Sequence, residues 1–331
     1  MSHRHQTTAS PLAALTDLIA PELAEVDRLF MQELATDLPC VNTLVKHVSR
    51  FRGKMLRPIL VLLAGKAVGK TSPAHTIIAT VVEMVHMATL VHDDVLDEAE
   101  LRRKGATINH LRGNEAAVLL GDYLISHSYH LCSSLDSQFA SRTIAHTTNQ
   151  VCCGELLQID NRNNYDLSEE TYLKIITLKT AVLCASCCSL GAKLGGADDA
   201  QVAALETYGR CLGIAFQIQD DILDIVGDPR TVGKTLGIDI EKGKMTLPMI
   251  HFLRVAPHEH RDLLRSLLAS SDADKSERIG NLILPSKSID FARDRARHLI
   301  DKARGALREL PESPARAVLD TMAEFVISRP M

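Results

Sequence analysis

Tryptophan is absent from this 331-residue chain, and aromatic residues make up only 4% of it. β-Branched and aromatic residues are enriched in β-strands, so the shortage of aromatics favours packed helices over a β-sandwich. The sequence also lacks a convincing hairpin signal and any sustained alternation of β-branched residues. Apolar residues recur instead at helical spacing along most of the chain. We therefore predict an all-α fold.

The chain also lacks a strong net charge and a long apolar run, and we expect no secretory leader. Its formal charge is −4, which argues against a nucleic-acid-binding surface. No uninterrupted apolar run reaches the roughly 18 residues that span a bilayer, and the first residues lack the apolar core of a secretory signal. We expect a cytoplasmic protein that neither spans a membrane nor binds nucleic acid.

The chain has eight cysteines, but their spacing is weak evidence for a metal or redox site. Cys184, Cys187 and Cys188 leave a zinc or redox site open as an alternative. No second C-x-x-C and no matching histidine pair accompanies them. Reduced thiols packed in an apolar helix are therefore favoured.

No break in composition marks a domain boundary, although the length exceeds the usual size of one domain. Apolar residues make up 46% of the chain, which is enough for a large core. We predict a flexible N-terminus at residues 1–10 and a single all-α domain over residues 11–331.

Nucleotide-binding motifs are missing as well, and no nucleophile with a paired base can be read from the sequence. What the chain has is the pattern D-D-x-x-D twice, each time after an apolar segment with helical spacing, over residues 76–97 and 200–226. The six carboxylates are Asp93, Asp94 and Asp97 in the first motif and Asp220, Asp221 and Asp224 in the second.

Clustered carboxylates at the ends of apolar helices need a compensating charge. Residues four apart share a helix face and repel when both are acidic, and the C-terminal end of a helix disfavours anions. One such motif is explained equally well by a solvated helix face, but two copies are not. Mg²⁺ binds carboxylate oxygens together with water and substrate phosphates. The sequence therefore predicts two facing clusters that hold Mg²⁺ and a bridging polyanion.

Basic residues accompany the carboxylates in four stretches, namely Lys54 and Arg57, Arg102 and Arg103, Lys179, and Lys234 and Lys244. Any one of them could be a solvated side chain. Arginine pairs with phosphate through two parallel hydrogen bonds, whereas lysine acts as a point charge. Together they predict a phosphorylated substrate and two anion sites, one that uses metal and one that uses side chains alone. The chemistry would then be electrostatic, with metals drawing off a leaving group inside an apolar cavity.

In this order and spacing the motifs resemble the trans-type (E-) polyprenyl diphosphate synthases over nearly the whole chain, and among them the long-chain octaprenyl diphosphate synthases. The resemblance is carried by Gly53 to Pro58, His86, Leu90 to Asp97, Arg102 and Arg103, Gly121 and Asp122, Gly154 and Glu155 with Gln158, Lys179 and Thr180, Phe216 to Asp224, Gly233 and Lys234, and Lys242 to Pro248.

The resemblance implies an isoprenoid synthase-type orthogonal helical bundle around a deep central apolar cavity, and a homodimer. It implies a Mg²⁺-dependent prenyltransferase that condenses isopentenyl diphosphate head to tail with an allylic diphosphate. The departing diphosphate would remove the proton, which would explain the missing base.

It also implies roles for single residues. Three Mg²⁺ ions would be held by Asp93, Asp97 and Asp220, with Asp94, Asp221 and Asp224 in support. The allylic diphosphate would be contacted by Arg102, Lys179, Thr180, Gln217, Lys234 and Lys244. Isopentenyl diphosphate would bind without metal to Lys54, Arg57, His86 and Arg103.

Product length would follow from the floor of the cavity beneath the first acidic motif. The residues four and five before Asp93 are Thr89 and Ala88, both small, and below them lie Val85, Met84 and Val81. By this resemblance, small floor residues imply a deep cavity and a long product of about C30–C45, which would serve as a quinone side-chain precursor.

Other readings stay open. Ala88 could merely pack against a neighbouring helix, and the product could then be geranylgeranyl or farnesyl diphosphate. The chain could also be a subunit of a heteromeric synthase. A class I terpene cyclase is disfavoured, because the second motif is again D-D-x-x-D and cations for a separate isopentenyl site are present.

Overall fold

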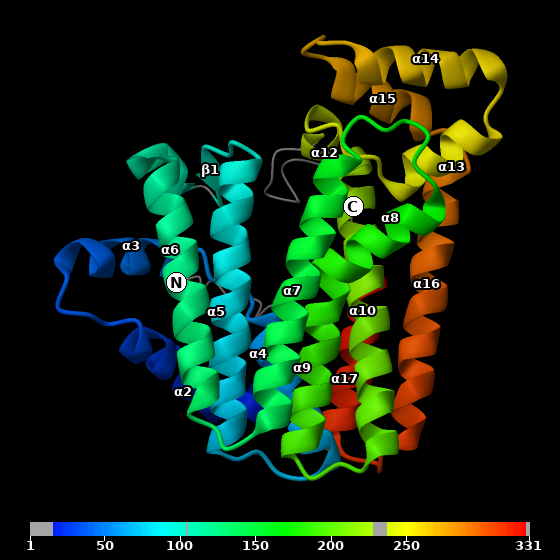
Figure 1. Ribbon diagram of the computed structural model, residues 1–331. Coiled ribbons are helices and arrows are strands. Elements are labelled where there is room, and N and C mark those ends of the chain that lie inside the picture. Colours follow the sequence, from blue (N-terminus) through cyan, green and yellow to red (C-terminus); the bar gives the residue numbers. More distant parts are fainter. Residues whose placement is uncertain (1–15, 104, 228–236, 329–331) are drawn as a thin grey trace, which may run out of the picture.

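The computed structural model describes residues 16–103, 105–227 and 237–328. Within these ranges the chain is helical almost throughout, and most long helices run side by side (Figure 1). The predicted all-α fold is therefore confirmed. The N-terminus that was expected to be flexible, residues 1–10, lies outside the described residues, and so does Lys234.

Two long helices, α5 (Pro73–Leu96) and α10 (Asp199–Val226), carry the acidic motifs at their C-terminal ends. Each begins at a capping box, in which the N-cap side chain and the side chain three residues later bind the backbone reciprocally. The N-cap residues are Ser72 and Asp198. These local signals and the apolar spacing explain why both helices begin and end within a few residues of their predicted limits.

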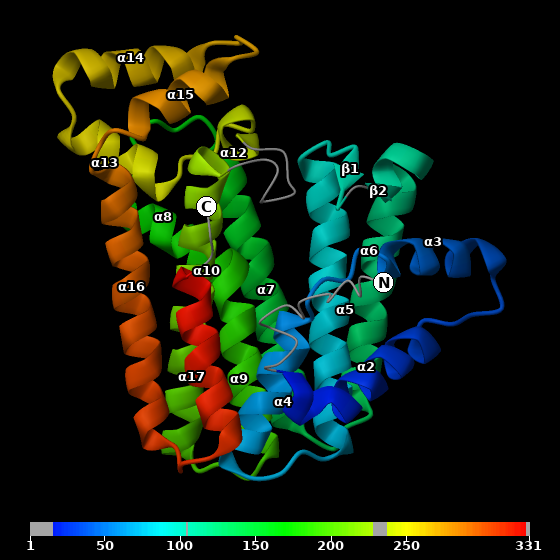
Figure 2. The same ribbon diagram turned by 180° about the vertical axis from the view of Figure 1, so that it is seen from behind.

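The remaining helices surround this pair (Figure 2). They are η1 (Asp17–Ile19), α2 (Ala20–Glu33), α3 (Pro39–Ser49), α4 (Leu56–Val68), α6 (Ile108–Ser133), α7 (Gln138–Asp160), α8 (Glu169–Ile176), η2 (Thr177–Ala181), α9 (Val182–Leu194), α12 (Ile238–Glu241), α13 (Leu247–Val255), α14 (His258–Ala269), α15 (Lys275–Ile283), α16 (Ser288–Ala306), η3 (Leu307–Glu309) and α17 (Pro314–Ile327). Helix α5 packs mainly on α6 and α4, and α10 packs mainly on α16 and α9.

The polar, glycine-punctuated segment 98–115 reads as a loop in the sequence, but it contains two elements that its residues do not reveal. Strands β1 (Leu101–Arg102) and β2 (Gly105–Ala106) pair antiparallel in a short hairpin. Helix α6 then begins at Ile108, where the side chain of Thr107 accepts a hydrogen bond from the His110 amide. Strands of two residues are too short to show alternation. Gly113, at φ 83°, interrupts the helical geometry and hid the start of α6.

Two helical stretches are long and apolar enough to cross a membrane by length and composition, Pro73–Leu96 and Glu169–Leu194. Of their most apolar windows, 72% and 78% respectively lie buried inside the protein, as in core helices of globular domains. Cys184, Cys187 and Cys188 lie in the second stretch, almost completely buried. Burial raises the pKa of all three thiols, and they pack as small apolar residues.

Candidate active site

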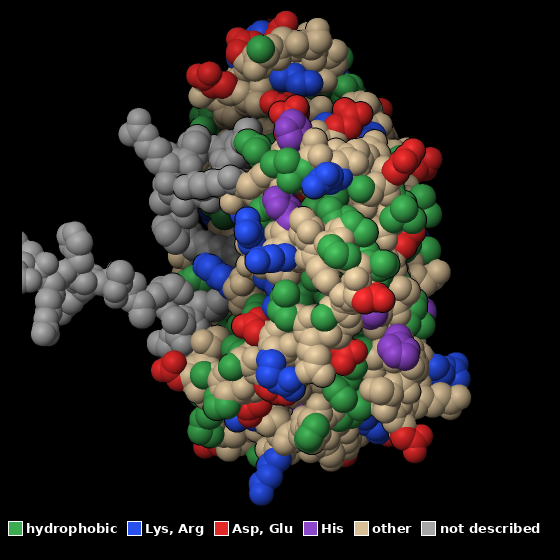
Figure 3. Space-filling view, turned by 90° about the vertical axis from the view of Figure 1, so that its left-hand side faces the viewer, with side chains coloured by type: hydrophobic (Ala, Val, Ile, Leu, Met, Phe, Trp, Pro, Cys, Tyr) green, Lys and Arg blue, Asp and Glu red, His purple; other side chains and the backbone are tan. Residues whose placement is uncertain are grey.

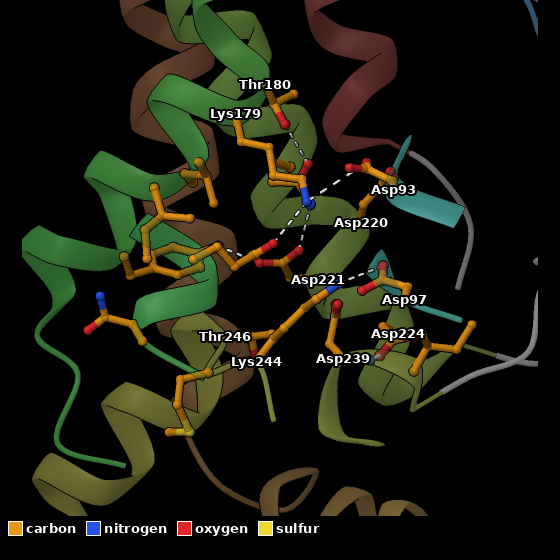
Figure 4. Close-up of a pocket in the computed structure, with 18 of the residues that line it drawn as sticks. Asp93, Asp97, Lys179, Thr180, Asp220, Asp221, Asp224, Asp239, Lys244 and Thr246 are labelled. Atoms are coloured by element: carbon orange, nitrogen blue, oxygen red, sulfur yellow. Dashed lines mark hydrogen bonds and ion pairs between the residues drawn. The ribbon is translucent and has the colours of Figure 1, made fainter. Parts of the chain in front are cut away.

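A cavity of about 320 Å³ lies between the C-terminal ends of α5 and α10. Its wall is completed by residues of α7, α8 and η2 and by the segment 238–246. Five of the six motif carboxylates line it, namely Asp93, Asp97, Asp220, Asp221 and Asp224. Lys179 and Lys244 reach in among them from opposite walls (Figure 4). Two stretches far apart in the sequence thus form one strongly charged site.

The first motif is held by cations. Asp97 Oδ2 accepts a hydrogen bond from Lys244 Nζ at 2.9 Å, and Lys179 Nζ lies 3.9 Å from Asp93 Oδ2. Burial raises the pKa of Asp93 to about 6, and the neighbouring Glu155 and Asp97 carboxylates add to this effect. A cation bound beside Asp93 would offset the unfavourable burial of its charge.

Asp94 lies away from the cavity, although it belongs to the same motif. Only 5% of the residue is exposed, and it accepts hydrogen bonds from the Arg102 guanidinium at 2.7 to 3.0 Å. Arg102 also lines the cavity. Asp94 thus fixes the β1–β2 hairpin, and with it Arg102, at the end of α5.

The second motif contains a buried hydrogen-bond network. Asp221 accepts hydrogen bonds from Tyr172 Oη at 2.7 Å and from Gln217 Nε2 at 2.8 Å. Thr180 Oγ1 donates to Gln217 Oε1 at 2.9 Å, which fixes the orientation of that amide. Burial, with Asp239 and Asp220 adding repulsion, raises the pKa of Asp221 well above its usual value. Asp221 therefore fixes the side chains of Tyr172 and Gln217, which also line the cavity.

Sequence reasoning missed the sixth carboxylate that lines the cavity, Asp239. Its amide donates a hydrogen bond to Asp224 Oδ2 at 3.1 Å. Burial and the charge of Asp239 raise the pKa of Asp224 to about 7. Asp239 belongs to α12, whose four residues are too few for a periodic pattern. In the sequence, Asp239 is distinguished only by its place between Gly237 and Lys244, in the glycine-containing segment that follows the second acidic motif.

Lys179 lies on η2, a π-helical turn between α8 and α9. Such turns are frequent at functional sites. Gly154 of α7 lets this turn approach, because a Cβ there would lie 2.6 Å from the Lys179 amide nitrogen. Lys179 Nζ forms an ion pair with Glu155 and donates to Gln158 Oε1 at 2.9 Å. Burial opposes its charge, but Asp93 and Glu155 outweigh burial and raise the pKa of Lys179.

The residues expected to bind an anion without metal lie beside the hairpin. Arg103 Nη1 donates to the Phe51 carbonyl at 2.7 Å, and its guanidinium lies against Gly53. Burial, and the charges of Arg57, Arg102 and Arg103, keep the pKa of His86 well below its usual value. His86 is therefore neutral beside two or more guanidinium groups.

Lys54 is exposed, and its ammonium lies 5.9 Å from the ring centre of Phe325 in α17. Glu83 is a buried carboxylate next to this cluster, 3.9 Å from Arg52 Nε. Positive charge prevails at this second site, which suits a phosphate group held by side chains alone.

The five expected floor residues lie below the cavity described above. Val81, Met84, Val85 and Ala88 are at most 1% exposed, and the Thr89 hydroxyl donates to the His86 carbonyl at 2.8 Å. None of them lines the cavity, whose lining residues on α5 begin at Leu90. The open floor therefore stays a prediction.

The donor set fits a hard divalent cation. The acidic side chains of the cavity offer only oxygen, and burial, with repulsion from neighbouring carboxylates, raises the pKa values of Asp93 and Asp224. Among the described residues, no three acidic, histidine or cysteine side chains form a complete metal cage. Mg²⁺ takes only one or two carboxylates and draws its other ligands from water and phosphate.

Comparisons with known proteins agree with this site. A family model described as polyprenyl synthetase matches residues 39–283. The chain is 34% identical over 319 residues to the octaprenyl diphosphate synthase of Escherichia coli (strain K12), covering 96% of this chain and 99% of that protein. It is 33% identical over 304 residues to heptaprenyl diphosphate synthase component 2 of Bacillus subtilis (strain 168), covering 92% and 87%. The crystal structure of a decaprenyl diphosphate synthase from Rhodobacter capsulatus superposes with a TM-score of 0.91 at 34% identity, covering 96% and 98%.

Proposed function

Since the chain belongs to the polyprenyl synthetase family, we propose that it condenses isopentenyl diphosphate head to tail with an allylic diphosphate and releases a trans polyprenyl diphosphate. One observation carries the proposal. Two acidic motifs, at the ends of α5 and α10, line one cavity together with Lys179 and Lys244. Arg57, Arg102 and Arg103 lie close enough to His86 to lower its pKa, which supports a second, cationic site.

Three Mg²⁺ ions held by Asp93, Asp97 and Asp220 would supply the Lewis acidity that draws the diphosphate off the allylic carbon. In this proposal Asp94, Asp221 and Asp224 support these ligands. Lys179, Lys244 and Lys234 hold the allylic diphosphate, together with Arg102, Thr180 and Gln217. Charges placed in advance where the leaving group develops its own charge lower the barrier without reorganisation.

The apolar part of the cavity wall then protects the allylic cation from water. Leu90, Ile175, Ile176 and Leu223 provide this surface next to the acidic residues. Lys54, Arg57, His86 and Arg103 hold isopentenyl diphosphate so that its double bond reaches the cation. The described residues that line the cavity include no histidine, and the departing diphosphate removes the proton.

Two variants separate the two anion sites. Arg57→Gln raises the KM for isopentenyl diphosphate about tenfold, because a phosphate contact is worth roughly 1.4 kcal/mol or more. The same variant leaves the KM for the allylic substrate unchanged, and Lys244→Gln does the reverse. If either variant raised both KM values equally, the assignment of two sites would be wrong.

We further propose a long product, about C30–C45, that serves as a quinone side-chain precursor. The small residues Ala88 and Thr89 support this length, as do the octaprenyl and decaprenyl names of the relatives. A geranylgeranyl or farnesyl diphosphate synthase is the second candidate, because the cavity described here ends at Leu90.

A homodimer in the cytoplasm completes the proposal. Exposed apolar side chains follow α6 and α7, namely Leu111, Val118, Leu119, Leu156 and Ile159. Hydrophobic side chains also gather on the face that α6 occupies (Figure 3). Exposed apolar groups of this kind favour a second copy of the chain. Light scattering of the purified protein tests this, and a relative named as one component of a synthase makes a heteromeric subunit the alternative outcome.

A further inference from the structure

The turn that joins α7 to α8 reaches the first acidic motif through Arg162. Arg162 Nη2 lies 3.3 Å from Asp97 Oδ1 and 3.4 Å from the Leu96 carbonyl oxygen. Its Nε is buried and has no hydrogen-bond partner among the described residues. The amide of the next residue, Asn163, donates to the Gly243 carbonyl at 2.8 Å. The turn therefore connects the end of α5 with the segment that carries Lys244.

Asp97 is held by two cations at once. Arg162 contacts Oδ1, and Lys244 Nζ donates to Oδ2 at 2.9 Å. A divalent cation that binds this carboxylate needs one of the two oxygens at about 2.1 Å. It would then lie within a few ångströms of both positive groups and be repelled by them. The metal must therefore displace at least one of them.

Arg162 is the more easily displaced of the two. Its distance to the carboxylate is longer, and its side chain is 27% exposed against 10% for Lys244. Partly exposed ion pairs are weak. Once released, the guanidinium stays tethered near Asp97 and the segment that carries Lys244, because Asn163 anchors the turn to Gly243. A diphosphate coordinated to a metal on Asp97 would lie next to it, and guanidinium pairs with phosphate through two hydrogen bonds.

We propose that Arg162 is a positioning residue with two alternative partners. It holds Asp97 in the metal-free protein, and it moves to the diphosphate of the allylic substrate when a divalent cation takes Asp97 Oδ1. The proposal rests on the function proposed above, since it assigns a further contact to the same diphosphate.

Two effects of opposite sign follow for Arg162→Gln. The substrate-free protein binds Mg²⁺ about two- to fivefold more tightly, because a competitor of the strength of a partly exposed ion pair is gone. The allylic diphosphate binds about tenfold more weakly, because a charge-assisted phosphate contact is lost. A residue with a merely structural role would weaken both. Arg162→Lys keeps the positive charge but loses the guanidinium's two parallel hydrogen bonds. The affinity for Mg²⁺ therefore stays close to that of the unchanged protein, and part of the affinity for the diphosphate is restored.

The matched control is Arg265→Gln. Arg265 Nη2 donates to Asp166 Oδ1 at 2.6 Å and so ties the same α7–α8 connection to α14, away from the cavity. This variant loosens the connection without removing a charge from the site. Both affinities should stay unchanged.

The experiment is calorimetric titration of the full chain with Mg²⁺ alone, followed by titration with inorganic pyrophosphate in the presence of Mg²⁺. Neither step needs turnover, so the result does not depend on whether the unchanged protein elongates prenyl chains. Tighter Mg²⁺ binding together with weaker pyrophosphate binding in Arg162→Gln supports the proposal. Unchanged or weaker Mg²⁺ binding overturns it. If Arg162→Gln fails to fold, Arg162→Lys decides, because unchanged pyrophosphate affinity in that variant contradicts the phosphate contact.

Discussion

Protonated Asp93 and Asp224 should stabilise the metal-free protein at acid pH, and this contribution should be lost as the pH rises from about 4 to about 7. Asp93 and Asp224 have pKa values of about 6 and about 7 in the folded chain, against an ordinary value of 3.8. Between these values the folded state retains protons that the unfolded chain releases. The contribution of these two carboxyls is therefore lost with rising pH in this window, whereas His86, whose lowered pKa keeps it neutral in the folded chain, contributes in the opposite sense. A carboxyl whose pKa is lowered by a cationic partner has the opposite effect, since its contribution to stability grows as the pH rises.

The magnitude follows from the shift. Two pKa units for Asp93 correspond to about 3 kcal/mol. The Asp93 side chain is 23% exposed, so solvent screening reduces this to roughly 1 to 2 kcal/mol. Asp224 adds a similar amount. For a chain of this length, about 3 kcal/mol in total corresponds to a melting temperature lowered by about 4 °C.

Mg²⁺ should reverse the trend, because only ionised carboxylates bind it. The assay is thermal unfolding in EDTA and in Mg²⁺ at several pH values between about 5 and 8. The difference between the two melting temperatures should be near zero at the acid end and grow towards the alkaline end. Asp224→Asn is the control, since it removes one of the titrating groups and flattens the EDTA curve. Identical pH dependence in EDTA for the unchanged protein and Asp224→Asn, or a Mg²⁺ effect independent of pH, would refute the reasoning.

Three further predictions concern single side chains. Gly154→Ala pushes the π-helical turn away from α7 and displaces Lys179, so kcat/KM falls about a hundredfold. The free energy of unfolding in urea changes by at most a few kcal/mol. Unchanged kinetics would show that the close approach of α7 to this turn is dispensable. Tyr172→Phe removes a hydrogen bond to the buried Asp221 and lowers the free energy of unfolding in urea by about 2 kcal/mol. A decrease below roughly 0.5 kcal/mol would show that this hydrogen bond does not stabilise the fold. Ala88→Phe shortens the product as sized by chromatography, with exposed Ala269→Phe as control, and an unshortened product would exclude the floor assignment.

The long helices could be predicted from the sequence because their signals are local. Apolar spacing and the caps at Ser72 and Asp198 fix α5 and α10, and both motifs fall at the helix ends. The start of α6 could not be predicted, because Gly113 breaks the helical geometry within its first turns.

The contacts of the site depend on tertiary structure and were less predictable. Repetition of D-D-x-x-D pointed to the carboxylates that line the cavity, but nothing in the motif indicated that Asp94 lies apart from it, against Arg102. Asp239 and Arg162 belong to short segments, and only the packing of α12 and of the α7–α8 turn brings them to the site. The same holds for the pairing of Glu155 with Lys179, which needs the close approach at Gly154.

The central claim is tested most directly by incubating the purified protein alone with isopentenyl diphosphate, farnesyl diphosphate and Mg²⁺, and sizing the dephosphorylated products. We predict a discrete long-chain prenyl alcohol that forms only when isopentenyl diphosphate and Mg²⁺ are both present. Consumption of the allylic substrate without isopentenyl diphosphate, or no elongation at all, would contradict the account.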